Sequence, residues 1–279
     1  MLKVALPNKG ILSETAILML KEAGYAVRRD AKDLHVVDQI NDIEFFYLRP
    51  RDIATYVGAG SLDAGITGKD LLLDSRSKAE SVADLEFGGS TFRFAGPIGA
   101  FKSINDLTGK TVATAYPRLV EDYLTRLGVQ AHIVSLDGAV EVAVRLGVAD
   151  AVADVVSTGN TLRQAGLETF GEVLLVSSAQ LIVAPGSQVN FQQLLRRLQG
   201  VVVARSYVIV DYDCPANLVE KASAITPGIE SPTISPLRDP EWVAVRALVK
   251  SDEVNQKMDE LYALGARAIL VSALHAARI

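Results

Sequence analysis

Apolar residues follow two alternating spacings along the chain, and this alternation predicts strands and helices in turn. Short apolar runs that suit buried strands occupy residues 3–6, 44–48, 63–67, 110–114, 132–136, 148–156 and 179–183. Helical spacing fits residues 12–23, 53–60, 118–128, 139–146 and 191–198. Strands that alternate with helices indicate an α/β fold whose sheets are largely parallel.

The order of these segments predicts two lobes with a cleft between them. A second unit begins near residue 93, and a polar connector at 103–109 precedes its next strand. The later strand at 179–183 and the helix at 191–198 are expected to return to the first unit. We therefore predict a first lobe of residues 1–92 and 179–206 and a second lobe of residues 93–178.

The last part of the chain has a different pattern. Strands are expected at 201–210, 233–236, 243–249 and 268–273, with helices at 218–225 and 254–264. This βαββαβ order is typical of a ferredoxin-like domain. Residues 207–279 are therefore predicted to form a separate small domain.

Composition narrows the classes of partner. The 279 residues hold 28 Lys and Arg against 33 Asp and Glu, a net charge of −5, so no basic surface for nucleic acid or an anionic membrane is expected. The single cysteine, Cys214, permits no intramolecular disulfide, which fits a reducing compartment, and no Cys/His cluster predicts a metal cage. The chain shows neither a signal-peptide pattern nor an apolar run of about 18 residues, so we expect a cytoplasmic protein.

The stretch DVVSTGNTL, residues 154–162, joins the apolar run at 148–156 to a loop of small and hydroxyl-bearing residues. Such a loop can direct several backbone N–H groups at one phosphate, and a following helix adds the positive end of its dipole. Asp154 would repel phosphate and is better suited to sugar hydroxyls or Mg²⁺. A carboxylate followed by a phosphate cradle suits a ribose 5-phosphate group. The alternative is an ordinary turn whose Ser and Thr cap the next helix.

A set of residues around this loop keeps fixed spacings: Glu141, Gly147, Ala149, Val152, Asp154, Val155, Thr158, Gly159, Thr161 and Leu162. The set resembles the signature of the ATP phosphoribosyltransferases. The stretches PNKG (7–10), FFYLRPRDIATYVGAG (45–60), DAGITGKDLL (63–72), ATAYP (113–117), ESPTISPL (230–237) and WVAVRALV (242–249) are also similar to that family. The resemblance covers essentially the whole chain and includes the regulatory extension of the family's long form.

The resemblance implies a two-lobed core like that of periplasmic binding proteins, followed by a ferredoxin-like domain. It also implies a reaction in which N1 of ATP's adenine attacks C1 of phosphoribosyl pyrophosphate and pyrophosphate leaves, the first step of histidine biosynthesis. Positioning and charge neutralisation would dominate this step, and Mg²⁺ would bridge the pyrophosphate. Asp154 and Glu141 are the candidate metal ligands and, with Lys9, the candidate catalytic residues.

Two sets of substrate contacts are expected. The phosphoribosyl set is Asp154, Val155, Val156, Ser157, Thr158, Gly159, Asn160 and Thr161. The nucleotide set is Lys9, Gly10, Arg49, Thr67, Asp70 and Tyr116. Arg51, across Pro50 from Arg49, could also reach phosphate oxygens. Four alternatives remain open: Lys9 is a solvated surface lysine, Arg51 pairs with Asp52, Asp70 caps a helix, and Tyr116 packs in the core.

The C-terminal domain suggests control by the end product. In the resembling family histidine binds there and inhibits, and dimers assemble into hexamers. The candidate histidine contacts are Asp213 for the ammonium group, Thr233 and Ser235 for the carboxylate, and Leu248 and Ala268 for the imidazole. The last two residues fit a purely structural role equally well.

Two other functions compete with this interpretation. A two-lobed solute-binding protein would share the fold, although the regulatory-looking tail disfavours it. A purine- or orotate-type phosphoribosyltransferase would share the acid followed by a phosphate loop. Those enzymes usually carry two adjacent acids before the loop, where this chain has Ala153 and Asp154.

Overall fold

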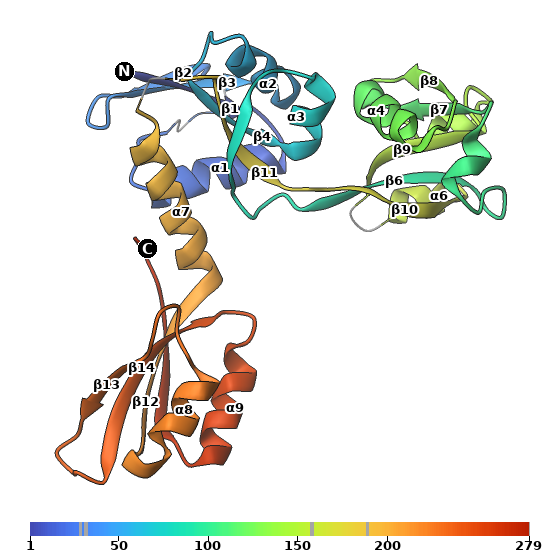
Figure 1. The fold of residues 1–279 in the computed structure, drawn as a ribbon. Helices are drawn as coiled ribbons and strands as arrows, with labels where there is room; N and C mark the ends of the chain where they lie inside the picture. Colours follow the sequence, from blue (N-terminus) through green and yellow to red (C-terminus); the bar gives the residue numbers. More distant parts are fainter. Residues whose placement is uncertain (28–29, 31–32, 157–158, 188–189, 279) are drawn as a thin grey trace. The chain divides into compact units, whose positions relative to one another are not determined.

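The computed structural model describes residues 1–27, 30, 33–156, 159–187 and 190–278 (Figure 1). The chain forms two compact units, Met1–Leu195 and Arg196–Ile279. Helix α7 (Gln192–Ser206) contains the break between them. The first unit holds two sheets and the second holds one.

The first sheet has the strand order β2-β3-β1-β4-β11-β5. Its strands are β1 (Leu2–Pro7), β2 (His35–Asp38), β3 (Ile43–Leu48), β4 (Ala64–Gly68), β5 (Glu80–Asp84) and β11 (Ala179–Val183). Strands β3, β1 and β4 are parallel, whereas β11 runs antiparallel between β4 and β5. The intervening helices are α1 (Ile11–Glu22), α2 (Pro50–Gly58) and α3 (Lys69–Ser75).

The second sheet has the order β10-β6-β9-β7-β8. Its strands are β6 (Ser90–Pro97), β7 (Thr111–Thr114), β8 (His132–Ser135), β9 (Ala151–Val156) and β10 (Leu167–Ser177), with helices α4 (Pro117–Leu127), α5 (Val142–Arg145) and α6 (Asn160–Gln164). Strands β9, β7 and β8 are parallel. Phe92, Phe94 and Leu107 are fully buried in its core.

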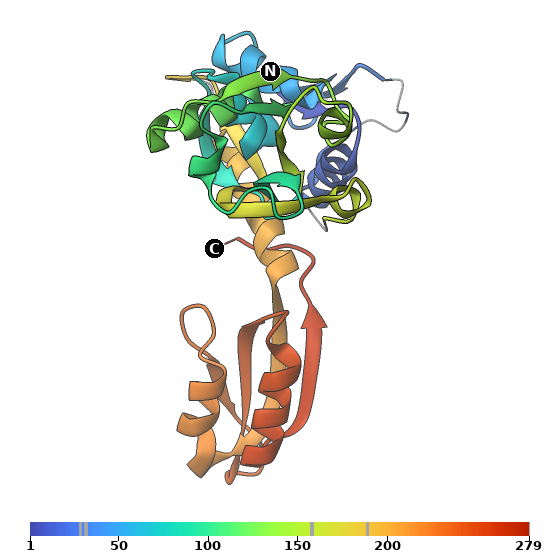
Figure 2. The ribbon, with the colours of Figure 1, turned by 90° about the vertical axis from the view of Figure 1, so that its right-hand side faces the viewer.

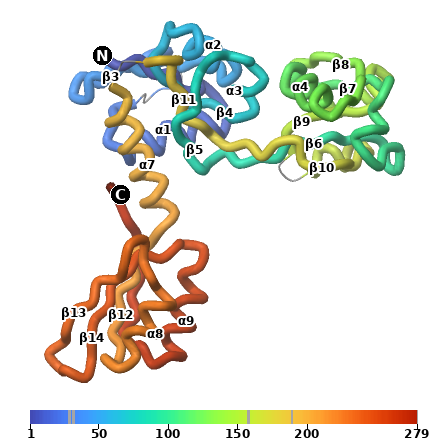
Figure 3. The backbone as a smooth tube through the Cα atoms, in the orientation of Figure 1, coloured from blue at the N-terminus to red at the C-terminus, as the bar shows by residue number. Residues whose placement is uncertain are grey.

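Two chain segments connect the sheets and run side by side, one between β5 and β6 and the other between β10 and β11 (Figure 3). Hydrogen bonds join them: the Leu85 N–H donates to the Ala179 carbonyl at 2.9 Å, and the Ala179 N–H donates to the Phe87 carbonyl at 2.8 Å. Each sheet therefore packs its own core, and the paired connection links the two.

The second unit is a four-stranded antiparallel sheet of order β13-β14-β12-β15. Its elements are β12 (Tyr207–Pro215), α8 (Val219–Ile225), β13 (Thr233–Pro236), β14 (Trp242–Lys250), α9 (Val254–Leu264) and β15 (Arg267–Ala273). Both helices cover one face of the sheet (Figures 1 and 2), where Tyr212, Cys214 and Leu261 are buried. The predicted fold class, a two-lobed α/β core with a C-terminal βαββαβ domain, is confirmed.

Two expected elements differ from the structure. Residues 201–206 continue α7 and do not start a strand, because Leu194, Leu198 and Val201 are buried at helical intervals and this burial outweighs the strand propensity of the valine run. The helix expected at 139–146 is confined to α5, since Ala139 adopts a left-handed φ of 49°. Within the described residues, no helix is both long and apolar enough to cross a bilayer.

A buried hydrogen bond joins the C-terminal sheet to α8 and supports a stability prediction. The hydroxyl groups of Tyr212 and Thr226 lie 2.8 Å apart, and Thr226 also donates to the Ala222 carbonyl at 3.3 Å. Tyr212→Phe is expected to lower the free energy of unfolding by about 1 kcal/mol, since the ring remains and one hydrogen bond is lost. Urea denaturation monitored by circular dichroism measures this difference, and an unchanged midpoint would contradict it.

Candidate active site

The predicted substrate residues gather at the carboxyl ends of parallel strands in both sheets of the first unit. After β1, β3 and β4 come Lys9 with Gly10, Arg49, and Lys69 with Asp70. In the second sheet Tyr116 follows β7, and Asp154 lies near the end of β9. Ligands of open α/β sheets bind outside this edge. Lys9, Gly10 and Arg49 are exposed there.

Asp70 and Tyr116 interact electrostatically at this edge. Asp70 is 7% exposed, and its carboxylate accepts a hydrogen bond of 3.0 Å from the Ser177 hydroxyl. Burial, followed by the charges of Asp70 and Asp154, raises the pKa of Tyr116 well above its ordinary value. The Tyr116 ring also meets Phe92 edge-on with centroids 5.1 Å apart. The Tyr116 hydroxyl thus lies in the field of two carboxylates, those of Asp70 and Asp154.

Arg51 lies over the Tyr116 ring, with its guanidinium carbon 5.0 Å from the ring centroid. Its Nη1 donates to Asp74 Oδ2 at 2.9 Å, so its ion-pair partner is Asp74 and not the neighbouring Asp52. Thr67 is fully buried and donates to the Pro50 carbonyl at 2.9 Å. Thr67 therefore stabilises the turn that presents Arg51.

Asp154 is partly buried within β9, which continues to Val156, and its Oδ1 accepts a hydrogen bond of 2.7 Å from the Val155 N–H. Burial is the main cause that raises the pKa of Asp154. The Val155 N–H opposes this shift, and the charges of Glu141 and Asp70 add to it. These interactions bring Asp154, Glu141 and Asp70 into one electrostatic cluster, and it is the place of Asp70 in it that no spacing in the sequence reveals.

The loop after Asp154 is described in part, because Ser157 and Thr158 lie outside the described residues. Val155 and Val156 are partly buried in β9, and Gly159 adopts a left-handed φ of 70° at the start of α6. The first N–H groups of a helix have no acceptor within it, so Asn160 and Thr161 can donate to a ligand. Helix α6 spans only Asn160–Gln164, so the amides of the loop matter more than a helix dipole.

Glu141 lies in the turn before α5 and is partly buried. No group of three or more His, Cys, Asp or Glu side chains is arranged to hold a metal among the residues that the structure describes. Asp154 and Glu141 therefore offer two carboxylates, and a cation here would draw its remaining ligands from a bound substrate. Mg²⁺ is commonly held in this way, by one or two carboxylates and substrate phosphates.

Two residues that contact Asp70 or Arg51 were not predicted. Ser177 ends β10, a strand that the hydrophobic pattern did not indicate. Asp74 lies near the end of α3, is 6% exposed and contacts both Arg51 and helix α4. The only sequence signal for Asp74 is the stretch DLLLD (70–74), in which two acids flank three leucines.

The candidate histidine contacts lie on the sheet of the second unit. Val210, Tyr212 and Cys214 face the helices, so the alternate residues of β12 project from the opposite, open face. Cross-strand pairing places Ser235, Ala244 and Asp213 in one row of this face, and Thr233, Arg246 and Asp211 in the next. Ala268 has a left-handed φ of 49° where the pairing of β12 with β15 is irregular.

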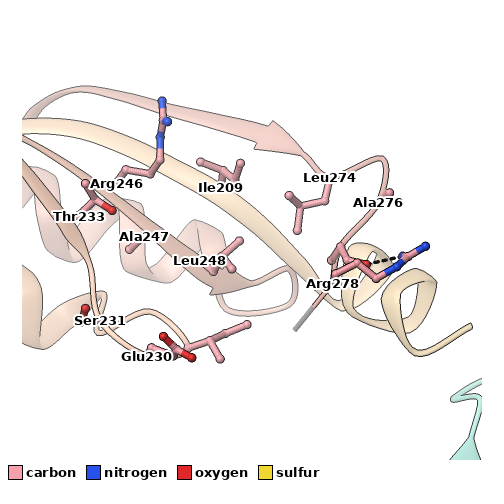
Figure 4. Close-up of a pocket in the computed structure, with 12 residues that line it drawn as sticks. Ile209, Glu230, Ser231, Thr233, Arg246, Ala247, Leu248, Leu274, Ala276 and Arg278 are labelled. Carbon is pink, nitrogen blue, oxygen red and sulfur yellow. Dashed lines mark hydrogen bonds between the residues drawn. The ribbon is translucent and has the colours of Figure 1, made fainter. Parts of the chain in front are cut away.

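A cavity of about 530 Å³ opens beside the second row (Figure 4). Thr233 and Leu248 line it, together with Glu230, Ser231 and Arg278. Figure 4 shows that its walls come from the loop before β13, from β14 and from the C-terminal segment. Arg246 also lines the cavity and donates to Asp211 at 2.7 Å. The structure thus brings Thr233 and Leu248 together, while Asp213, Ser235 and Ala268 lie outside this lining.

Comparisons with known proteins agree along the whole chain. A family model described as HisG: ATP phosphoribosyltransferase matches residues 49–200, and one described as HisG, C-terminal domain, matches residues 204–276. The chain is 61% identical over 286 residues to an ATP phosphoribosyltransferase of Paenarthrobacter aurescens (strain TC1), and the alignment covers 100% of both chains. It is 61% identical over 284 residues to one from Pseudarthrobacter chlorophenolicus, again over 100% of both.

A solved structure is similar to most of this chain. It is titled as an ATP phosphoribosyl transferase (HisG:HisZ) complex from Thermotoga maritima. The similarity has a TM-score of 0.63 at 30% sequence identity and covers 72% of this chain and 98% of that one.

Proposed function

Because the chain belongs to the ATP phosphoribosyltransferase family, we propose that it transfers the phosphoribosyl group of phosphoribosyl pyrophosphate to N1 of ATP's adenine. Phosphoribosyl-ATP and pyrophosphate are the products, and the reaction is the first step of histidine biosynthesis. The observation that carries this proposal is the partly buried Asp154, clustered with Glu141, Asp70 and Tyr116 at the start of a small-residue loop.

The phosphoribosyl group binds at the loop of residues 154–161 in this proposal. Backbone N–H groups at Gly159, Asn160 and Thr161 donate to the 5-phosphate, and the hydroxyl groups of Ser157 and Thr158 are proposed to do the same. Asp154 accepts from the ribose hydroxyls. As C1 loses pyrophosphate and the sugar becomes oxocarbenium-like, the carboxylates of Asp154 and Glu141 stabilise the developing positive charge.

A magnesium ion fits this acidic cluster when the substrate supplies its remaining ligands. Asp154 and Glu141 are close enough for the charge of Glu141 to raise the pKa of Asp154, and a divalent cation would relieve this repulsion. When bound, Mg²⁺ neutralises the pyrophosphate and makes it a better leaving group. Lys9, exposed after β1, adds a further positive charge for the pyrophosphate or the nucleotide.

The nucleotide is proposed to bind at the edge of the first sheet. The stacked pair of Arg51 and Tyr116 offers a flat surface that suits adenine. Gly10 and Arg49 are exposed and available to the triphosphate. Thr67 and Asp70 are buried, and each makes a hydrogen bond that supports this edge: Thr67 donates to the Pro50 carbonyl, and Asp70 accepts from Ser177.

Tyr116→Ala is expected to raise the KM for ATP by about tenfold, because base stacking on an aromatic ring contributes about 1 to 3 kcal/mol. The matched control is Tyr116→Phe, which keeps the ring and loses only the hydroxyl, and it should change the KM far less. Steady-state kinetics with ATP varied at saturating phosphoribosyl pyrophosphate measures both variants. Equal effects of the two substitutions would argue against stacking.

The second unit is proposed to bind histidine and to inhibit the first. The boundaries proposed for the parts are a catalytic lobe of residues 1–92 and 179–206, a second lobe of residues 93–178 and a regulatory domain of residues 207–279. Asp213 accepts from the ammonium group, and Thr233 and Ser235 donate to the carboxylate. Leu248, which lines the cavity, and Ala268, which lies outside that lining, are the proposed contacts of the imidazole. We also propose that homodimers assemble into a homohexamer. Light scattering with and without histidine tests this assembly.

A continuous absorbance assay of phosphoribosyl-ATP formation tests the activity directly. Product should form from ATP and phosphoribosyl pyrophosphate, depend on Mg²⁺, and fall when histidine is added. Free purine bases and orotate should not replace ATP. Binding of a small solute without any release of pyrophosphate would instead favour the solute-binding alternative.

A further inference from the structure

Three consecutive residues at the end of α3 contact helix α4 of the other sheet. The Arg76 guanidinium forms ion pairs with Glu121 and Asp122, and the Arg118 guanidinium donates to the Ser75 carbonyl at 3.1 Å. The Arg76, Glu121 and Asp122 side chains are 44%, 59% and 52% exposed, so solvent screens these pairs and they contribute little.

Asp74 differs from its neighbours because its side chain is only 8% exposed and three donors converge on it. Its Oδ1 accepts from the backbone N–H groups of Arg118 and Leu119 at 3.0 and 3.1 Å. Its Oδ2 accepts from Arg51 Nη1 at 2.9 Å. Helix α4 begins at Pro117, and the side chain of its N-cap residue, Tyr116, forms no capping hydrogen bond. Asp74 therefore caps α4 from a different helix.

Asp74 is connected to both Arg51 and Tyr116, whose side chains lie against each other. Arg51 is held directly through Oδ2, and Tyr116 is held through the helix that starts one residue after it. The guanidinium carbon of Arg51 lies 5.0 Å from the centroid of the Tyr116 ring. A buried carboxylate that accepts three hydrogen bonds fixes both side chains in one relative geometry.

We propose that Asp74 is a positioning residue for ATP, which holds Arg51 and Tyr116 in the stacked arrangement before the nucleotide arrives. The inference rests on the proposed nucleotide site at Tyr116. Preorganisation lowers the cost of ordering these side chains on binding. Loss of Asp74 therefore weakens ATP binding more than it weakens the binding of phosphoribosyl pyrophosphate.

The test compares Asp74→Ala, Asp74→Asn and Arg76→Ala in the full-length protein. Asp74→Ala is expected to raise the KM for ATP by about tenfold and that for phosphoribosyl pyrophosphate by less than about twofold. Asp74→Asn keeps an oxygen for the α4 amides and should recover part of the loss. Arg76→Ala removes the exposed ion pairs of the same junction and should leave both KM values unchanged.

A double-mutant cycle between Asp74→Ala and Tyr116→Ala separates this inference from the nucleotide site itself. If Asp74 acts through Tyr116, the two effects on the KM for ATP are strongly non-additive. Additive effects, or lower thermal midpoints of Asp74→Ala and Asp74→Asn with both KM values unchanged, would overturn the positioning role. If Tyr116→Ala alone leaves the KM for ATP unchanged, the nucleotide site is the part that fails.

If Asp74→Ala does not fold, Asp74→Asn decides the question through the same cycle. Its expected effect on the KM for ATP is about threefold, smaller than that of the alanine variant because the helix cap is kept. Unchanged KM values for a folded Asp74→Asn with a lowered thermal midpoint would show a purely structural role.

Discussion

Asp154→Asn is expected to lower kcat by at least about tenfold, which corresponds to about 1.4 kcal/mol of lost transition-state stabilisation, and to raise the thermal midpoint. Both effects have one origin, an ionised carboxylate held in a partly buried site beside Glu141 and Asp70. Asparagine keeps the shape and loses the charge. It therefore loses the attraction for an oxocarbenium-like sugar and for a cation, and it also loses the cost of burying the charge.

The pH dependence of stability follows from the raised pKa of Asp154. A carboxyl group that holds its proton more tightly in the folded state favours folding fully below its unfolded pKa of about 3.8, and this contribution is lost as pH rises through the folded pKa. At neutral pH the ionised Asp154 then destabilises the fold relative to asparagine. The advantage of Asp154→Asn should be small near pH 4 and grow toward pH 7.5.

Differential scanning fluorimetry across this pH range, paired with turnover at neutral pH, measures both consequences. Glu172→Gln is the matched control, since Glu172 is an exposed acid of the same sheet and its neutralisation should change neither property. A kcat within tenfold of the wild type would remove Asp154 from the site. A lower thermal midpoint for the variant at pH 7.5 would contradict the electrostatic account.

The position of the candidate site follows from local patterns. Small residues and charges follow the apolar runs that became β1, β4, β7 and β9, and parallel strands necessarily bring their carboxyl ends to a common edge. The βαββαβ order of the last part was equally local, because each element has its own spacing and its own end signals. Such features depend on neighbours in the sequence and can be inferred from it.

The supporting contacts were not predictable, because they join distant parts of the chain. Asp70 meets Ser177 across 107 positions, and Asp74 meets Leu119 across 45. The alternative in which Arg51 pairs with Asp52 considered only a sequence neighbour, whereas the folded chain brings Asp74 to the same guanidinium. Residues 201–206 were predicted as a strand because they include a run of valines. Their helical conformation becomes apparent only when the buried Leu194, Leu198 and Val201 are considered together, since these three recur at helical intervals.

Asp213→Ala is expected to weaken histidine binding by about 10- to 100-fold while leaving turnover without histidine unchanged. A charge-assisted hydrogen bond to an ammonium group contributes about 1.5 to 3 kcal/mol, and every 1.4 kcal/mol is about tenfold in affinity. Of the two acids of β12 on the open face, Asp211 is paired with Arg246 at 2.7 Å. No cation among the described residues forms an ion pair with Asp213, so its carboxylate is available to the ligand.

Isothermal titration of histidine into the full-length protein measures this loss. Asp259→Ala provides the control, because Asp259 is an exposed acid of α9 in the helical layer on the opposite face of the sheet. This variant removes the same charge from the same unit and should bind histidine as the wild type does. The difference between the variants then reports the ammonium contact, because the unit's net charge changes equally in both. A wild-type dissociation constant for Asp213→Ala would place the ammonium acceptor elsewhere, and Glu230 at the cavity wall would be the next residue to replace.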